Sequence, residues 1–164
     1  MLSLVGKMKK RTITPTEGSG DAEPAWLPLD QLVEAEITSE SSTHPIESAL
    51  LPGRPDGWRA ETPGEQTIRL RFEHPRAVRH VRVTIEERDR ERTQQFVLRA
   101  AATPEGPWRE IARQQFNFSP SGAVREQEDY HVNLPSVAVL ELTIVPDITG
   151  GDARASLQQL RIAG

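Results

Sequence analysis

The sequence predicts an all-β fold, an antiparallel β-sandwich of about eight strands. Apolar side chains recur at every second position in several short runs, which is the pattern of a strand with one buried face. The 13 prolines and 11 glycines divide the 164 residues into short pieces joined by turns. Long stretches with the apolar spacing of a helix are missing, so we expect two sheets that bury alternate side chains between them.

We expect the first 30 residues to form a flexible tail. They hold turn-forming and charged residues without a regular apolar alternation, so they bury too little surface to order themselves. Near the end of this tail, Trp26, Leu27 and Leu29 are bulky apolar residues that we expect to dock on the domain. The remaining residues, 31–164, are expected to form one domain of ordinary size.

The alternation of apolar residues places the strands in order. In the first, Val33, Ala35 and Ile37 share one face, and glutamates occupy the other. A single helical turn that carries Ile46 and is capped by Thr43 is expected next. The further strands are expected at residues 67–72, 80–87, 95–102, 108–116, 129–134, 137–145 and 156–163.

Residues 116–129 are expected to form a long polar loop, which is the first candidate for a binding site because loops on a rigid scaffold carry binding residues. The loop offers Phe116, Asn117, Phe118 and Arg125. This mixture of apolar rings with amide and guanidinium donors suits the recognition of sugars and of proteins alike. A loop that tucks both phenylalanines into the core is an equally well supported alternative.

A second loop, residues 51–59, contains several prolines and glycines and is expected at one end of the sandwich. Its charged residues, Arg54, Asp56 and Arg59, are expected to flank the binding site, with solvated loop charge as the alternative explanation. Trp58 in the same loop can stack on a sugar ring, but burial is the commoner state of such a tryptophan. We therefore expect Trp58 to be a core residue.

The amino-acid composition limits the classes of binding partner that we expect. The net charge is −4 with both signs interspersed, so we expect neither nucleic acid nor membrane as a partner. Cysteine is absent, which excludes disulfides, thiol nucleophiles and thiolate metal sites. No stretch approaches the roughly 20 apolar residues of a membrane span, and the apolar residues precede the lysines at the start, unlike a secretory signal. A cytoplasmic location is the expectation.

The sequence does not indicate an enzyme. It lacks a Gly-x-Ser-x-Gly elbow, an HExxH helix and a phosphate-binding glycine loop. The acidic pair Glu86 and Glu87 lies in a charged hairpin, where solvation is expected to keep both carboxylates ordinary. The four histidines lie far apart, without the spacing of metal ligands.

Several motifs of residues 31–164 occur in a familiar order. They are the loop with Gly57 and Trp58, the strand TIRLRF, the turn PEGPW followed by Ile111, and the closing strand SLQQLRIAG. In this order they resemble the galactose-binding-like or discoidin domains, of the coagulation factor 5/8 type C kind. The resemblance implies a jelly-roll sandwich that binds carbohydrate, lipid or protein through loops at one end, without catalysis.

The resemblance also raises the question of a structural metal ion. Many members of the family have a calcium loop that begins with an Ala-Leu-Asp-Gly motif, and a glutamate in the closing strand. Here residues 50–53 read Leu-Leu-Pro-Gly, and Gln158 or Gln159 stands in the closing strand. Amides and a proline supply less charge than Ca²⁺ prefers. We therefore expect no cofactor, and a structural calcium ion is disfavoured.

Two functions remain open at this point. The first is a carbohydrate-binding module, which the family resemblance and the phenylalanines of the loop favour. The second is an intracellular module for protein–protein interaction or scaffolding, favoured by the absence of cysteine and by the altered calcium loop. We place the carbohydrate hypothesis first because of its frequency in the family.

Overall fold

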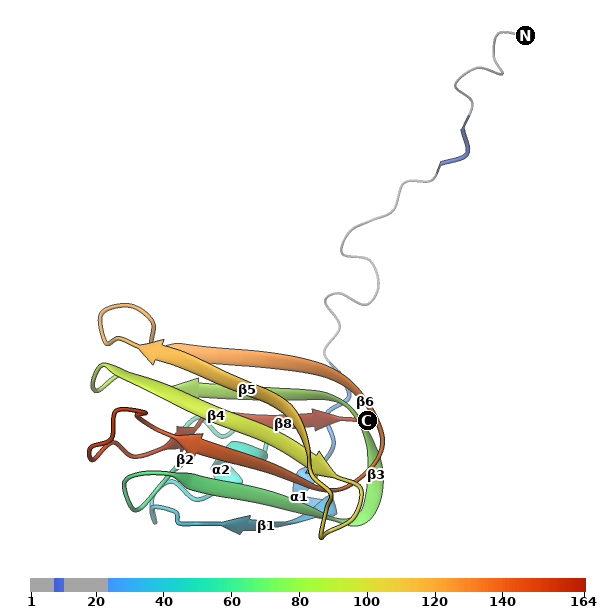
Figure 1. The fold of residues 1–164 in the computed structure, drawn as a ribbon, viewed down its shortest axis with the longest axis horizontal. Coiled ribbons are helices and arrows are strands. Elements are labelled where there is room, and N and C mark those ends of the chain that lie inside the picture. The colour runs from blue at the N-terminus through green and yellow to red at the C-terminus, as the bar shows by residue number, and fades with distance from the viewer. Residues whose placement is uncertain (1–7, 11–23) are drawn as a thin grey trace, which may run out of the picture.

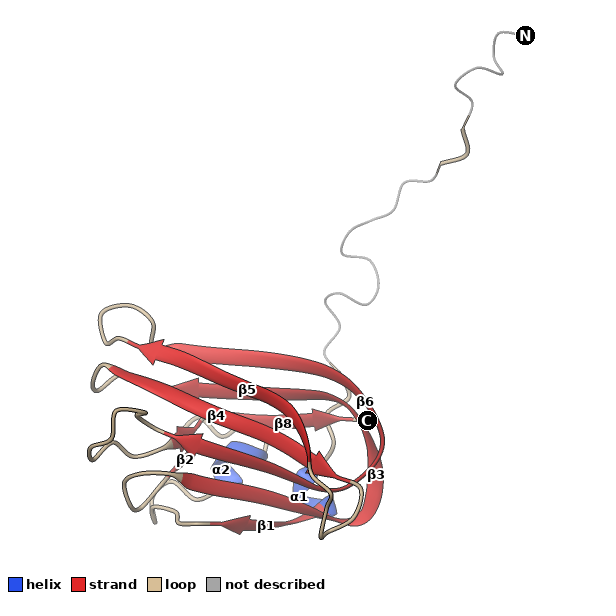
Figure 2. Cartoon of the chain, in the orientation of Figure 1, coloured by secondary structure: helices blue, strands red, loops and turns tan. Residues whose placement is uncertain are grey.

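The computed structural model describes residues 8–10 and 24–164, and most of this part of the chain is an antiparallel β-sandwich (Figures 1 and 2). The elements in chain order are α1 (Leu29–Leu32), β1 (Val33–Ile37), α2 (Glu47–Leu50), β2 (Trp58–Arg59), β3 (Gln66–Glu86), β4 (Arg92–Ala101), β5 (Arg109–Phe118), β6 (Arg125–Val145), β7 (Ser156–Leu157) and β8 (Gln159–Ala163). The predicted fold class is therefore confirmed.

Strands β3 and β6 belong to both layers of the sandwich. One layer has the order β1-β3-β6-β4-β5, and in the other β8 pairs with the second half of β3, which still pairs with β6. The two long strands stay paired while they bend from one layer into the other, on the right in Figure 1. Between Arg71 and His80 the register of the pairing shifts, and such irregularities allow paired strands to bend.

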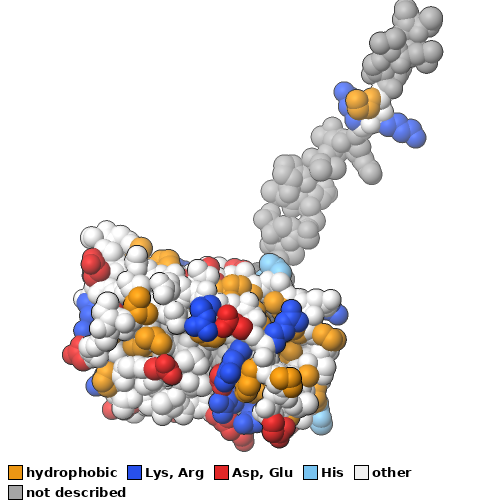
Figure 3. Space-filling view, viewed as in Figure 1, with side chains coloured by type: hydrophobic (Ala, Val, Ile, Leu, Met, Phe, Trp, Pro, Cys, Tyr) orange, Lys and Arg blue, Asp and Glu red, His pale blue; other side chains and the backbone are white. Residues whose placement is uncertain are grey.

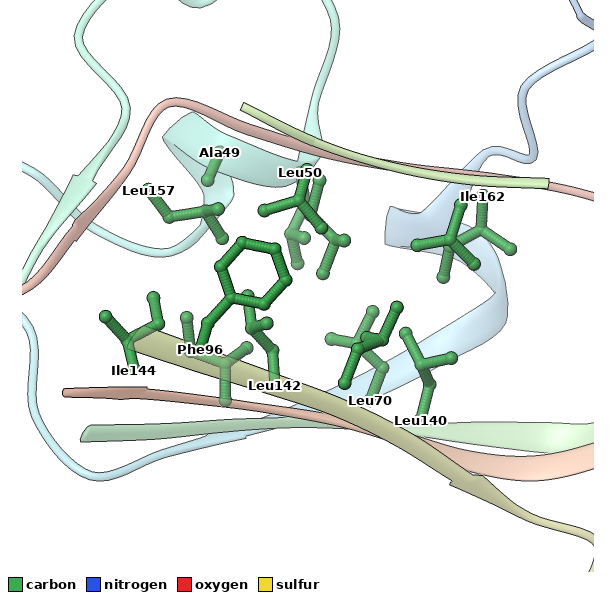
Figure 4. Packing of buried hydrophobic residues seen from close by; sticks show 14 of the residues in the cluster. Ala49, Leu50, Leu70, Phe96, Leu140, Leu142, Ile144, Leu157 and Ile162 are labelled. Carbon is green, nitrogen blue, oxygen red and sulfur yellow. The ribbon is translucent and has the colours of Figure 1, made fainter. Parts of the chain in front are cut away.

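The core lies between the two layers. Alternate residues of β3, β4 and β6 point inward, among them Leu70, Phe96 and Leu142, all with no exposed surface. Figure 4 shows these side chains packed against Leu157 and Ile162 from the opposite side. This alternation is the one that the sequence pattern predicted.

The expected burial of Trp58 is also confirmed. Its side chain is 1% exposed, and its indole Nε1 donates a hydrogen bond to the backbone oxygen of Ser39 at 3.0 Å. The ring therefore belongs to the core, and none of its surface is available for stacking on a sugar.

Some expected element boundaries are wrong. The ranges 67–72 and 80–87 are parts of a single strand, β3, and 129–134 and 137–145 are parts of β6. The helical turn α2 has Ile46 at its N-cap, not Thr43. The hydroxyl of Thr43 instead bonds the ring of His44.

Residues 24–30 contact the sandwich, although residues 1–30 were assigned to a tail. Trp26 forms a bridge with Ala163, and the backbone N–H of Leu27 donates to the oxygen of Ile162 at 2.8 Å. Leu29 is 1% exposed. Most of the predicted tail, residues 1–7 and 11–23, lies outside the described residues, so the domain boundary stays a prediction. In the described part of the chain, no helix is long and apolar enough to cross a membrane.

Candidate functional site

Several loops converge at the end of the sandwich away from the bend, on the left of Figure 1. Residues at this end of the sandwich line a cleft. We call it the loop-end cleft. It has a volume of about 370 Å³ and is lined by Arg59, Glu86, Glu87, Arg88, Asp89 and Gln158. A neighbouring depression of about 260 Å³ shares Arg59 and Asp89 with it and continues over Pro63, Arg90, Asp152 and Arg154.

The loop-end cleft forms because three segments end there. Strand β3 ends at Glu86, and the charged turn to β4 supplies Arg88 and Asp89. Strand β2 supplies Arg59, and Gln158 is the single residue between β7 and β8. Antiparallel strands that end at one edge bring turns from distant parts of the chain together.

The floor of the cleft contains a buried ion pair. Glu87 and Arg92 both have side chains that are 1% exposed, and the distance from Oε1 of Glu87 to Nη2 of Arg92 is 2.5 Å. The hydroxyl of Ser156 also donates to the Glu87 carboxylate, and Arg59 Nη1 lies 3.7 Å from it. Burial raises the pKa of Glu87, while Ser156, Arg92 and Arg59 act in the opposite direction. The expectation of a solvated Glu87 is therefore wrong.

The wall of the cleft is held by exposed charges. Glu86 Oε1 accepts a hydrogen bond from Arg125 Nη1 at 2.9 Å, and Arg88 Nη2 lies 3.8 Å from Glu86 Oε2. The side chain of Arg88 is 70% exposed and that of Asp89 is 58% exposed. Asp89 Oδ2 lies 3.9 Å from Arg90 Nε, so both groups form long ion pairs at the surface.

The structure separates the residues that the sequence assigned to one site. Arg59 lines the loop-end cleft, and Arg125 lies next to it through Glu86. Arg54 and Asp56 are exposed in a loop at its border, where the side-chain amide of Gln158 donates to the backbone oxygen of Pro55.

The predicted loop at 116–129 is wrong, and with it the proposed role of its aromatic residues. Phe116, Asn117 and Phe118 belong to strand β5, and residues from Arg125 onward belong to β6. Phe118 has no exposed surface and Phe116 is half-buried, with ring centroids 4.7 Å apart. The alternative of core phenylalanines is correct, because the strand alternation continues through them.

Asn117 lies on the opposite face of β5. Its Oδ1 accepts a hydrogen bond from the Thr93 hydroxyl at 2.7 Å. The side chain thus joins β4 to β5, and Asn117 is not among the residues that line the loop-end cleft.

The residues at the place of the family's calcium loop do not fit a metal ion. The backbone oxygens of Ala49 and Leu51 both accept hydrogen bonds from the Arg161 guanidinium, at 2.9 and 3.1 Å. A cation at these oxygens would meet a positive charge that already binds them. Among the described residues there is also no cluster of three histidine or acidic side chains that could hold a metal ion.

Charged side chains of both signs are interspersed over the face of the molecule seen in Figure 3. On the outer side of the larger layer, Glu141 receives hydrogen bonds from Arg69 and Arg99, and Arg99 also lies over the ring of Trp108, 4.2 Å from its centroid. Arg69 and Arg99 are therefore paired with an acid on this side of the sandwich.

The chain has the fold of carbohydrate-binding modules of family 32. The family 32 module of C. perfringens NanJ in complex with galactose matches 84% of this chain and 96% of its own, with a TM-score of 0.62 and 16% identity. The corresponding module of AlyQ, in complex with 4,5-unsaturated mannuronic acid, matches 80% of this chain and 94% of its own, at a TM-score of 0.59 and 16% identity. The expected galactose-binding-like fold is therefore confirmed.

Two other similar structures are not isolated carbohydrate-binding modules. Reduced XRCC1 bound to the DNA polymerase beta catalytic domain matches 81% of this chain and 95% of its own, at a TM-score of 0.59 and 13% identity. In a Ruminococcus gnavus GH29 fucosidase, the match spans 25% of an enzyme chain. No family model and no curated protein matches the sequence. The likeness therefore establishes the fold, which non-catalytic modules and parts of enzymes share.

Proposed function

We propose that this chain is a non-catalytic carbohydrate-binding module whose ligand binds in the loop-end cleft. The observation that carries the proposal is the convergence of Arg59, Arg88 and Asp89 around one opening. Guanidinium and carboxylate groups are planar and bind two neighbouring hydroxyl groups at once, which is how proteins orient sugars. The complexes of similar modules with galactose and with an unsaturated mannuronic acid support this class of ligand.

Recognition in this cleft is expected to depend on hydrogen bonds. The described lining residues include no aromatic ring, and both phenylalanines of β5 pack inward. Stacking on a sugar ring therefore contributes little, and affinity should fall with increasing salt if the ligand carries carboxylates.

Removal of the exposed charges of the cleft is expected to abolish most of the binding. In the double variant Arg88→Ala and Asp89→Asn, the affinity for glycans should fall at least about tenfold, because charge-assisted hydrogen bonds contribute about 1.5–3 kcal/mol each. The measurement is a screen of the full chain on an array of plant, bacterial and animal glycans, followed by calorimetry on the glycans that bind. Both side chains are exposed, so the fold should persist.

Arg113→Ala is the matched control, because its side chain is 54% exposed and lies on β5, outside the cleft. It should bind like the wild type. Silence of the wild type over the whole array, or equal binding by all three proteins, would rule out the cleft as the glycan site.

Two related properties belong to the same proposal. The absence of catalysis is supported by the similarity to isolated binding modules. A cytoplasmic location is supported by the lack of cysteine. Fractionation of the native host tests the location.

A second candidate function is protein interaction, which a groove beside the edge strand β1 favours. This edge groove has a volume of about 510 Å³ and lies between β1 and α2. Its apolar lining includes Val33, Ala35 and Ile37, which are half-buried, and exposed Asp30 and Glu47 stand at its rim. Among the described strands β1 pairs with β3 alone, so its other edge is open there for an added strand.

We expect an extended segment with alternating apolar and basic residues to bind there. Its apolar side chains would fill the groove, and its lysines or arginines would face the acidic rim. A synthetic peptide that alternates valine and lysine should bind the full chain in a fluorescence anisotropy titration, and an Ala35→Arg variant should not bind it. Equal binding of a valine–glutamate peptide would refute the charge complementarity, and no binding would refute the site.

A further inference from the structure

A buried arginine holds the turn after α2 against the last strand. Arg161 of β8 is 7% exposed. Its Nη1 donates to the backbone oxygens of Ala49 at 2.9 Å and Leu160 at 3.3 Å, and its Nη2 donates to that of Leu51 at 3.1 Å. Three carbonyl groups from two distant parts of the chain therefore converge on one positive group.

The partners of Arg161 are unusual for a buried charge. Within residues 24–164, its guanidinium donates hydrogen bonds to backbone oxygens, and no carboxylate forms an ion pair with it. Burial lowers the pKa of Arg161, with no acidic group acting against it. A guanidinium still keeps its charge in proteins, so the carbonyl dipoles must supply the stabilisation.

The carbonyl groups in turn need a positive partner. The helical turn α2 ends at Leu50, so the last carbonyl oxygens of this turn have no partner within it. These oxygens carry the negative end of the local dipoles, and a cation next to them is favourable. Backbone oxygens gathered in this way are also the ligands that hard metal ions use.

We propose that Arg161 is a built-in replacement for a structural metal ion. The guanidinium provides a fixed cation that ties the α2 turn to β8, so that the fold is complete without calcium. This inference concerns the scaffold and does not depend on whether the loop-end cleft binds a glycan.

The contacts of Arg161 also hold the loop that follows α2. Leu51 begins the loop that carries Arg54 and Asp56, and the amide of Gln158 holds this loop again at Pro55. Arg161 and Gln158 thus fix the loop at two points from one short stretch of chain.

The test combines a metal titration with substitutions at Arg161. Addition of millimolar calcium, or of a chelator, should leave the melting temperature of the full wild-type chain unchanged. Arg161→Met should lower it by at least about 5 °C, because the carbonyl groups lose their partner. Arg161→Lys should retain a larger part of the stability, since an ammonium group is a compact cation with three donors.

Arg113→Met is the matched control for loss of an exposed arginine, and should melt like the wild type. A rise of the wild-type melting temperature in calcium that the chelator reverses would overturn the proposal. Equal stabilities of the Met and Lys variants would overturn it as well, because the positive charge would then have no role. If the Met variant does not fold, the calcium titration and the Lys variant still decide.

Discussion

Replacement of Arg92 by methionine is expected to lower the free energy of unfolding by about 3–5 kcal/mol. Arg92 is the closest charged partner of Glu87 at the floor of the cleft, and both side chains are almost fully buried. Without the guanidinium, the Glu87 carboxylate would remain in a site that already disfavours its charge. The loss is therefore a penalty for an uncompensated buried charge, beyond the value of the pair itself. Urea denaturation at neutral pH measures it.

The double variant of Glu87→Gln with Arg92→Met separates the two contributions. It removes both charges, so it should be more stable than the Arg92 variant alone, and the interaction energy follows from the double-mutant cycle. Arg113→Met again serves as the control at an exposed ion pair, with an expected loss below about 1 kcal/mol. If Arg92→Met cost no more than this control, the pair would have to be solvated, contrary to its burial.

Glu126→Gln is expected to remove a large pH dependence of stability. Glu126 is 2% exposed, and its Oε2 has no hydrogen-bond partner. Burial, reinforced by Glu128, raises its pKa to about 8 from an ordinary value of 4.5, although Gln94 donates to it at 3.2 Å. The folded state therefore holds a proton that the unfolded state releases between these pH values.

The sign of the effect follows from proton linkage. The stabilising contribution of protonated Glu126 is complete below about pH 4.5 and is lost as the pH rises to about 8. The slope is at most about 1.4 kcal/mol per pH unit. A glutamine resembles the protonated acid, so the variant should match the wild type near pH 4. It should exceed the wild type by several kcal/mol near pH 9.

Denaturation curves of both proteins across this pH range provide the measurement. Glu110→Gln is a suitable control, since Glu110 is exposed on β5 and pairs with Arg113. Its stability relative to the wild type should not change between pH 5 and pH 9. A constant difference for the Glu126 variant would show that this carboxyl group ionises like a solvated one.

The sequence predicted the layers of the fold because period-two alternation reports directly on burial. Val33 to Ile37 and Ile68 to Phe72 are strands whose apolar residues face the core, as the pattern indicated. The continuity of β3 was hidden by the polar stretch around Pro75, which looks like a loop. A proline is tolerated there because the ladder is already irregular at the bend.

The site was harder to predict because it depends on which turns meet. Arg59 was expected to flank the binding site from a loop, whereas its approach to Glu87 across the cleft arises from the pairing of strands far apart in sequence. Residues 86–92 are all acidic residues or arginines, and this density of charge is a signal in the sequence that marks the segment. A sequence pattern cannot tell which of these charges is buried, so Glu87 was misjudged.

The aromatic residues were misassigned for a related reason. Polar residues after Phe118 suggested a loop, but many of them occupy the solvent-facing positions of β6. An inward-facing glutamate such as Glu126 breaks the expected alternation of that strand, because a carboxyl group stands where an apolar residue is expected. Buried polar groups thus mark the places where the pattern fails and where the electrostatic predictions are strongest.

The bend of β3 and β6 has an evolutionary consequence. Both strands run from one layer to the other, so one end of the sandwich is closed by backbone pairing that depends little on side-chain identity. At the far end, turns and side-chain contacts such as the Glu87–Arg92 pair join the layers, and turns tolerate insertion and exchange. Replacement of these turns can change the surface at that end while the paired strands β3 and β6 preserve the fold. The XRCC1 structure shares this fold at 13% identity.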